Sequence, residues 1–188
     1  MHQIRQYFEQ QVNLSDKDWQ LFSSKLIKQV LPKNHPLLVA GQTEKYLSFI
    51  ETGIIRFYLS GKDYDRTFAF AFANNFASGY DSFLTQKPST YHIQTITETV
   101  LWRISATDLQ HIYQETEVGN TIGRYASEDL YLKKIKRELS LLYENAEQRY
   151  LNLFTEQPEL LEKIPLKFIA SYIGITPQAL SRIRRRIT

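Results

Sequence analysis

Cysteine is absent from the 188 residues of this sequence. Without a thiol, the chain can form no disulfide and offers no cysteine ligand to zinc or to an iron–sulfur cluster. The four histidines, at positions 2, 35, 92 and 111, are scattered and show none of the paired spacing that metal ligands adopt. The sequence therefore predicts a protein with no metal site and no haem.

Long apolar runs are missing as well. No run approaches the ~18 residues of a membrane span, and residues 1–11 lack the apolar centre of a signal peptide. Neither the nucleophile motif G-x-S-x-G nor the phosphate-binding motif G-x-x-x-x-G-K-S/T occurs. Because 43% of the residues are hydrophobic, a packed core is still expected. We therefore expect a folded cytoplasmic protein that makes no membrane contact and is not an enzyme.

The region 37–104 consists of short β-branched and aromatic segments separated by glycines, an asparagine pair and a proline. The segments are 37–39, 48–50, 54–59, 67–72 and 91–104. Several short strands with frequent turns and no long helix between them predict an antiparallel sandwich or jelly roll. Ser15 is predicted to cap a preceding helix that runs to Pro32, with Val30 on its buried side, and Ser105 to cap a following one. The fold class is therefore α+β, a β-roll with flanking helices.

A heptad pattern follows the β region. Val118, Tyr125, Leu132, Leu139 and Ala146 are spaced by sevens, and Thr121, Glu128, Ile135 and Leu142 lie three residues after the first four. Such an a/d pattern is typical of a helix that pairs with a second helix. The alternative is a helix packed on its own domain. The predicted dimer interface consists of Val118, Tyr125, Leu132, Ile135, Leu139 and Leu142.

The last segment, 164–188, predicts two helices joined by a tight turn. Pro165 suits the start of the first helix, Gly174 ends it, and Thr176 with Pro177 suits the start of the second. The predicted inner faces consist of Phe168, Ile169, Tyr172 and Ile173, and then Leu180, Ile183 and Ile187. This spacing indicates a helix-turn-helix, whose second helix, 176–187, enters the major groove of DNA. We expect three parts: a β-roll domain at 1–116, a dimerisation helix at 117–144 and a DNA-binding domain at 145–188.

Charge supports the same interpretation. From residue 163 onward the sequence has six basic residues and no acidic one, although the whole chain has a net charge of only +3. A concentrated basic segment is what phosphate contact requires. The simpler alternative is an ordinary helical hairpin with a solvated basic face.

The order of these elements, together with four stretches of sequence, resembles the Crp/Fnr family of bacterial transcription regulators. The stretches are Gly41, FIETGIIR at 49–56, FASGYDSFL at 76–84 and IASYIGITPQALSRI at 169–183. The last stretch resembles the variety of this motif that is common in the Bacteroidetes. The resemblance implies a cyclic-nucleotide-binding-like β-roll, a homodimer, double-stranded DNA as partner and contact with RNA polymerase. A wing after the helix-turn-helix, usual in the family, is not evident.

Roles on the DNA follow from residue type and position. Gln178, Ser181 and Arg182 occupy the first exposed turns of the second helix, where base edges are read, and Arg182 matches the family's base-reading arginine. By the usual pairings, Arg182 prefers guanine and Gln178 prefers adenine. The predicted phosphate contacts are Lys167, Thr176, Arg185 and Arg186.

The segment that resembles the family's nucleotide cassette is degenerate. Cyclic-nucleotide-binding members of the family have glutamate after the cassette glycine and an arginine further on. Here Gly79 is kept, Tyr80 stands at the glutamate position, and Thr90 and Tyr91 stand near the arginine position. A buried phosphate without its cation is costly, so we expect no ordinary cyclic-AMP binding. The predicted effector pocket consists of Gly79, Tyr80, Asp81, Ser82, Thr90 and Tyr91, with Arg103 as an alternative cation from a neighbouring strand.

The effector is unknown, and the β-roll either senses a different small molecule or serves as a scaffold; no cofactor is predicted. The aromatic residues Phe70, Phe72, Tyr80, Phe83 and Tyr91 either line an apolar pocket or form plain core. Alternatives to the main interpretation are a cyclic-nucleotide-responsive regulator with an atypical pocket, a cupin-like metalloenzyme and an interaction module that does not bind DNA.

Overall fold

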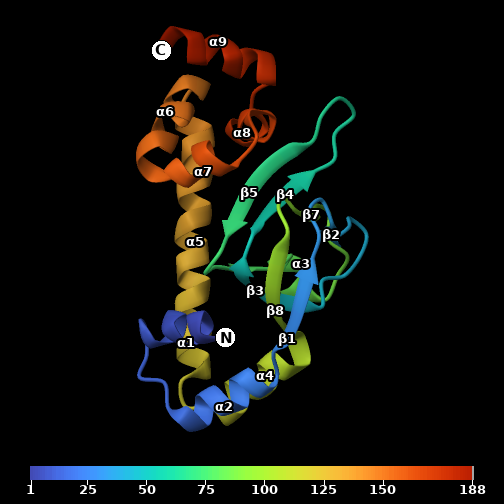
Figure 1. The fold of residues 1–188 in the computed structure, drawn as a ribbon, viewed down its shortest axis with the longest axis vertical. Coiled ribbons are helices and arrows are strands. Elements are labelled where there is room, and N and C mark those ends of the chain that lie inside the picture. Colours follow the sequence, from blue (N-terminus) through green and yellow to red (C-terminus); the bar gives the residue numbers. More distant parts are fainter. Residues whose placement is uncertain (188) are drawn as a thin grey trace. The chain divides into compact units, whose positions relative to one another are not determined.

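The computed structural model describes residues 1–187 and divides into two compact units (Figure 1). The first unit contains Met1–Phe57 and Phe70–Asp129. The second contains Tyr58–Ala69 and the chain from Leu130 onward. A strand hairpin and one long helix each contribute residues to both units.

Two four-stranded sheets form the β-roll within the described residues. The strands are β1 Ile27–Leu31, β2 Pro36–Leu38, β3 Tyr46–Thr52, β4 Ile54–Leu59, β5 Arg66–Phe72, β6 Phe76–Ala77, β7 His92–Thr95 and β8 Thr99–Ser105. One sheet has the order β1-β8-β3-β6 and the other β2-β7-β4-β5. The pairs β1–β8, β3–β8, β3–β6 and β2–β7 are antiparallel, which confirms the predicted α+β fold with an antiparallel roll.

The predicted helix up to Pro32 is wrong in its second half. Helix α2 ends at Ser24, and Ile27 to Leu31 form β1, which pairs with β8 from Ile27↔Arg103 to Leu31↔Thr99. Val30, expected on the buried side of that helix, is 58% exposed. Pairing with a neighbouring strand and the β-branched residues of this segment outweigh its helical spacing. The predicted strand 91–104 is likewise two strands, β7 and β8, which belong to different sheets.

Both predicted helix starts are confirmed. The side chain of Ser15 accepts a hydrogen bond from the backbone N–H of Asp18 at 3.1 Å and caps α2 (Asp16–Ser24). Ser105 accepts from the N–H of Asp108 at 3.1 Å and caps α4 (Ala106–Glu115). Each bond satisfies one of the backbone donors that the first turn of a helix leaves unpaired.

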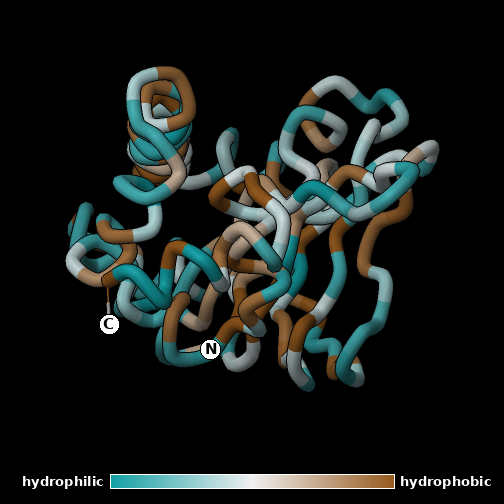
Figure 2. Tube along the Cα trace, turned by 90° about the horizontal axis from the view of Figure 1, so that it is seen from above, coloured by the Kyte–Doolittle hydropathy of each residue, from teal (hydrophilic) through white to brown (hydrophobic). Residues whose placement is uncertain are grey.

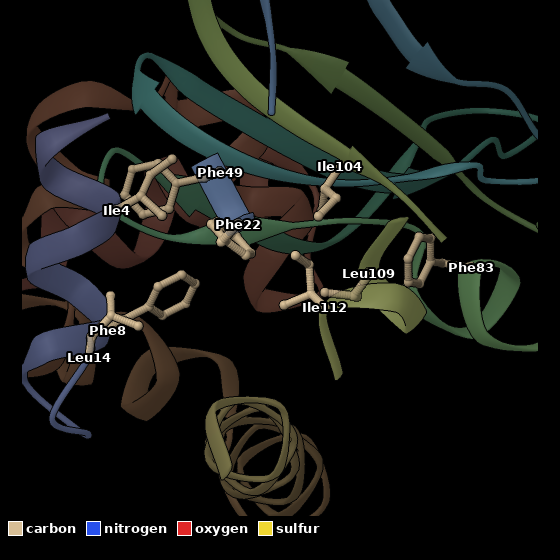
Figure 3. Close-up of a cluster of buried hydrophobic side chains, with 9 residues drawn as sticks. All are labelled: Ile4, Phe8, Leu14, Phe22, Phe49, Phe83, Ile104, Leu109 and Ile112. Carbon is tan, nitrogen blue, oxygen red and sulfur yellow. The ribbon is translucent and has the colours of Figure 1, made fainter. Parts of the chain in front are cut away.

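A hydrophobic core closes the β-roll together with its flanking helices (Figure 3). Helices α1 (His2–Glu9), α2 and α4 contribute side chains, and so do β3, β8 and α3 (Tyr80–Thr85). The buried side chains are Ile4, Phe8, Leu14, Phe22, Phe49, Phe83, Ile104, Leu109 and Ile112. The rings of Phe8 and Phe22 pack edge to face, with centroids 4.9 Å apart. Val118, predicted at a dimer interface, packs against this cluster.

The remaining described residues are almost entirely helical. The helices are α5 Gly119–Tyr143, α6 Ala146–Glu156, α7 Pro158–Lys163, α8 Leu166–Ile173 and α9 Pro177–Ile187. Asn145 and Gln148 form a capping box at the start of α6, which the sequence analysis did not anticipate. Within residues 1–187, no helix has the length and hydrophobicity needed to cross a membrane.

Candidate nucleic-acid interface and effector cassette

Helices α8 and α9 are joined by a turn that requires glycine. Gly174 ends α8 with φ of +85°, and the N–H of Ile175 donates to the carbonyl of Ala170 at 3.0 Å. The side chain of Thr176 then accepts from the N–H of Ala179 at 3.2 Å, at the start of α9. The left-handed glycine and the threonine cap thus satisfy backbone groups at both helix ends and fix the turn.

We expect Gly174→Ala to destabilise the protein by about 1–2 kcal/mol, because an alanine at positive φ is strained. Space is not the cause, since the nearest atom to an added Cβ is Arg149 Nη2 at 3.7 Å. Chemical denaturation measures the loss. Gly41→Ala is the matched control, with φ of +91° and no atom within 4 Å of the added Cβ. It should cost similar stability without affecting α9, and an unchanged stability of Gly174→Ala would contradict the account.

The apolar side of the α8–α9 pair is buried, and its polar side is exposed. Ile169, Ala170, Ile173, Leu180 and Ile183 are all at most 6% exposed. All the predicted DNA contacts are exposed: Lys167, Thr176, Gln178, Ser181, Arg182, Arg185 and Arg186. The structure thus brings every predicted DNA-contact residue to the surface of one helix pair.

One of these cations is engaged within the chain. Arg186 Nη2 donates to Glu147 Oε2 at 2.7 Å, which joins the end of α9 to the start of α6. Both side chains are solvent-accessible, so the pair is weak, within about 0–1 kcal/mol.

Two arginines that sequence reasoning missed hold the C-terminal end of α8. Arg137 of α5 donates to the carbonyl of Tyr172, and its guanidinium lies 4.0 Å from the centre of the Tyr172 ring. Arg149 of α6 donates to the carbonyl of Ile173 at 2.9 Å. The last carbonyls of a helix have no partner within the helix and attract cations. The two arginines therefore attach α8 to α5 and to α6.

A third attachment comes from the β4–β5 hairpin, whose tip belongs to the same unit as α8. The hydroxyl of Ser171 donates to the carbonyl of Asp65 at 2.6 Å and accepts from the N–H of Thr67 at 2.7 Å. No sequence pattern predicts these bonds, because the partners are more than a hundred residues apart.

The long helix α5 exposes a stripe of apolar side chains. Figure 2 shows this helix nearly end-on, with its hydrophobic residues in brown. Tyr125, Leu132, Leu139 and Leu142 are 37%, 63%, 45% and 72% exposed. Ile135 is half-buried. Exposed apolar residues at heptad spacing are what a second helix would cover.

The predicted effector cassette surrounds the start of α3. Gly79 and Ser82 are buried, Tyr80 and Tyr91 are half-buried, and Asp81 and Thr90 are exposed. The Tyr91 hydroxyl donates to Asp81 Oδ1 at 2.5 Å. Burial, and then this bond, raises the pKa of Tyr91 far above its ordinary value, so the hydroxyl stays protonated and remains a donor.

Arg103, the alternative cation, is committed to other partners. Its guanidinium donates to Ser48 Oγ at 3.2 Å and to Gln29 Oε1 at 2.8 Å. A further contact, to the buried carboxylate of Glu44, was also missed by the sequence analysis. Within residues 1–187, no group of three or more histidine, cysteine, aspartate or glutamate side chains is arranged to hold a metal ion.

Comparison with known proteins identifies the domain that contains this cassette. Residues 28–116 match the family model of the cyclic nucleotide-binding domain. No curated protein matches the sequence.

Several solved structures share the fold at low sequence identity. The c-di-GMP-responsive global regulator CLP of Xanthomonas campestris is 15% identical with a TM-score of 0.70, covering 92% of this chain and 91% of that one. A protein described as a Crp/Fnr-family transcriptional regulator, from Eubacterium rectale, is 17% identical with a TM-score of 0.72, covering 93% and 83%. The catabolite activator protein of Thermus thermophilus is 18% identical with a TM-score of 0.58, covering 93% and 84%. Residues 28–116 are therefore similar to the cyclic nucleotide-binding domain, and the chain has the fold of these solved structures.

Proposed function

We propose that this protein is a homodimeric, sequence-specific DNA-binding transcription regulator of the Crp/Fnr type. The observation that carries the proposal is the exposed basic face of α9, on a helix pair whose apolar side is buried. In this proposal α8 and α9 form the helix-turn-helix, and α9 enters the major groove.

The face of α9 separates into two kinds of contact. Gln178, Ser181 and Arg182 lie at i, i+3 and i+4, so they share one side of the first turns of the helix. Amide, hydroxyl and guanidinium groups there pair with base edges, and Arg182 is suited to the O6 and N7 atoms of guanine. Arg185 and Arg186, with Lys167 of α8, supply the cations for phosphates.

The stripe on α5 supports the homodimer. A helix-turn-helix reads two half-sites when two copies are related by a two-fold axis. Arg137 connects α5 to α8 within one unit. In this proposal α5 both pairs the two copies and holds the α8–α9 pair of each copy. The distance between the two α9 helices then sets the spacing of the half-sites.

The β-roll is proposed to serve as a scaffold or to sense a ligand other than cyclic AMP. The support is the commitment of Arg103 to Ser48 and Gln29, together with the exposed Thr90 near the position where the family has its arginine. Contact with RNA polymerase, a cytoplasmic location and a Bacteroidetes source stay predictions from the sequence.

Glu147→Gln should strengthen DNA binding, because it frees Arg186 from its carboxylate partner and removes a negative charge beside it. The expected gain is at most about 1 kcal/mol, with the slope of log affinity against log salt steeper by about one ion. Fluorescence polarisation across a salt series measures both. Glu156→Gln is the control, because Glu156 pairs with Lys136 at 2.9 Å, outside the proposed interface. Equal effects of the two substitutions would remove Arg186 from the interface.

Selection from a pool of random duplexes tests the proposed function. We expect an inverted repeat whose half-sites are separated by about 10–10.5 base pairs or a multiple of that. If no sequence is enriched from the pool and the protein instead binds acidic proteins, the result would favour the interaction module that does not bind DNA.

A further inference from the structure

A carboxylate is buried beside the cassette. Glu44 precedes β3 and is 3% exposed. Its Oε1 accepts hydrogen bonds from the backbone N–H groups of Lys45 and Tyr46, each at 3.0 Å. Its Oε2 accepts from the N–H of Gly79 at 3.4 Å. Three backbone donors from two segments of the chain therefore converge on one carboxylate.

Arg103 provides the counter-charge from β8. Its Nη2 lies 3.6 Å from Glu44 Oε1, and its guanidinium stacks 4.2 Å from the centre of the Tyr46 ring. The Arg103 side chain is only 13% exposed. A buried charge is tolerated when it is paired and its remaining groups are hydrogen-bonded, and Ser48 and Gln29 provide those bonds to Arg103. The cation and the carboxylate therefore depend on each other.

The surrounding atoms leave Glu44 closely enclosed. A Cβ added to Gly79 would lie 2.5 Å from Leu38 Cδ2 and 3.4 Å from Glu44 Cβ. Ser82 Oγ accepts from the N–H of Glu44 at 3.0 Å and donates to the carbonyl of Lys87 at 2.5 Å. The glycine and the serine of the predicted effector pocket are thus both occupied by contacts within the chain.

We infer that Glu44 is the built-in anion of this cassette. Its carboxylate takes the backbone donors and the guanidinium that a carboxylate or phosphate ligand would need, so the site excludes such ligands while Glu44 is in place. Shortening Glu44 to alanine leaves the donors and Arg103 around an empty space of carboxylate size. That space becomes a site for a small carboxylate such as formate. The inference concerns the β-roll alone and does not depend on DNA binding.

Chemical rescue tests this inference. Thermal unfolding of the full chain is measured in sodium formate and in sodium chloride at equal ionic strength. Glu44→Ala should melt several degrees below the wild type in chloride and recover part of that loss in formate, increasingly with formate concentration, as expected for a ligand that binds only the folded state. Glu44→Gln keeps the space filled and should lose stability without any rescue.

Glu51→Ala is the matched control. Glu51 also belongs to the β-roll and pairs with Lys28 at 3.1 Å, but its side chain is 24% exposed. The control and the wild type should respond alike to the two salts. Equal responses of Glu44→Ala to formate and chloride would overturn the inference, as would a wild type stabilised by cyclic AMP.

If Glu44→Ala folds in neither salt, the inference is tested instead by amide hydrogen exchange of Glu44→Gln. Faster exchange at the N–H of Gly79 than in the wild type supports the carboxylate bond, and unchanged exchange there overturns it.

Discussion

Replacing Leu132 and Leu139 together by glutamate should leave the protein monomeric and abolish its tight binding to a two-fold symmetric site. The two side chains are 63% and 45% exposed at successive heptad positions of α5. Each leucine that a second helix covers contributes up to about 1.5–3 kcal/mol, and glutamates facing one another would add repulsion. Light scattering measures the mass, and polarisation with a full site and a single half-site measures binding.

Leu141→Glu is the control for this experiment. Leu141 lies on the same helix and is 48% exposed, but it falls outside the heptad positions. It should leave the dimer intact. A dimer that persists in the double variant, or one that is lost equally in Leu141→Glu, would show that the stripe on α5 is not the interface.

Arg182→Ala should weaken binding to the selected site by about 1–3 kcal/mol and relax the preference at one base pair of each half-site. The reason is the pairing of a guanidinium with the base edge of guanine, which no other base edge reproduces. Affinities for a panel of single-base variants of the site measure the change.

Arg184→Ala is the charge-matched comparison, because Arg184 is an exposed arginine on the same helix that is not among the predicted DNA contacts. It should weaken all sites to the same small extent, as loss of one positive charge does. If Arg182→Ala also lowered every affinity equally, Arg182 would be a phosphate contact and the assignment of the base-reading face would be wrong.

Local signals in the sequence predicted much of the fold. Ser15 and Ser105 each stand three residues before an aspartate, and both cap helices as expected. Gly174 adopts the left-handed conformation that its place between two helical patterns indicated. These features depend on a few neighbouring residues, so their physics is contained in a short stretch of chain.

What the sequence did not predict depends on distant partners. The apolar residues of 27–31 fit a helix by spacing alone, and pairing with β8, more than sixty residues away, makes them a strand. From its residue type alone, Glu44 would be expected at the surface. Its burial follows from the contacts with Gly79 and Arg103, which are distant in sequence. Arg137 and Arg149 likewise acquire their role from the carbonyls of Tyr172 and Ile173.

The predicted effector pocket shows how far residue type alone leads. The replacement at Tyr80 and Thr90 indicated that a nucleotide phosphate lacks its usual partners. It did not indicate that a carboxylate of the chain itself would occupy the donors near Gly79. The degenerate motif and the buried Glu44–Arg103 pair are therefore two independent reasons to expect that the cassette does not bind cyclic AMP.

The most direct test of the central claim is a polarisation titration of the pure protein against its selected site and a scrambled site. It is carried out at two salt concentrations, with and without cyclic AMP. The account predicts tight binding to the selected site, weakened by salt and unchanged by the nucleotide. Binding that requires the nucleotide would contradict the proposed role of the β-roll, and equal binding to both sites would contradict sequence-specific recognition by α9.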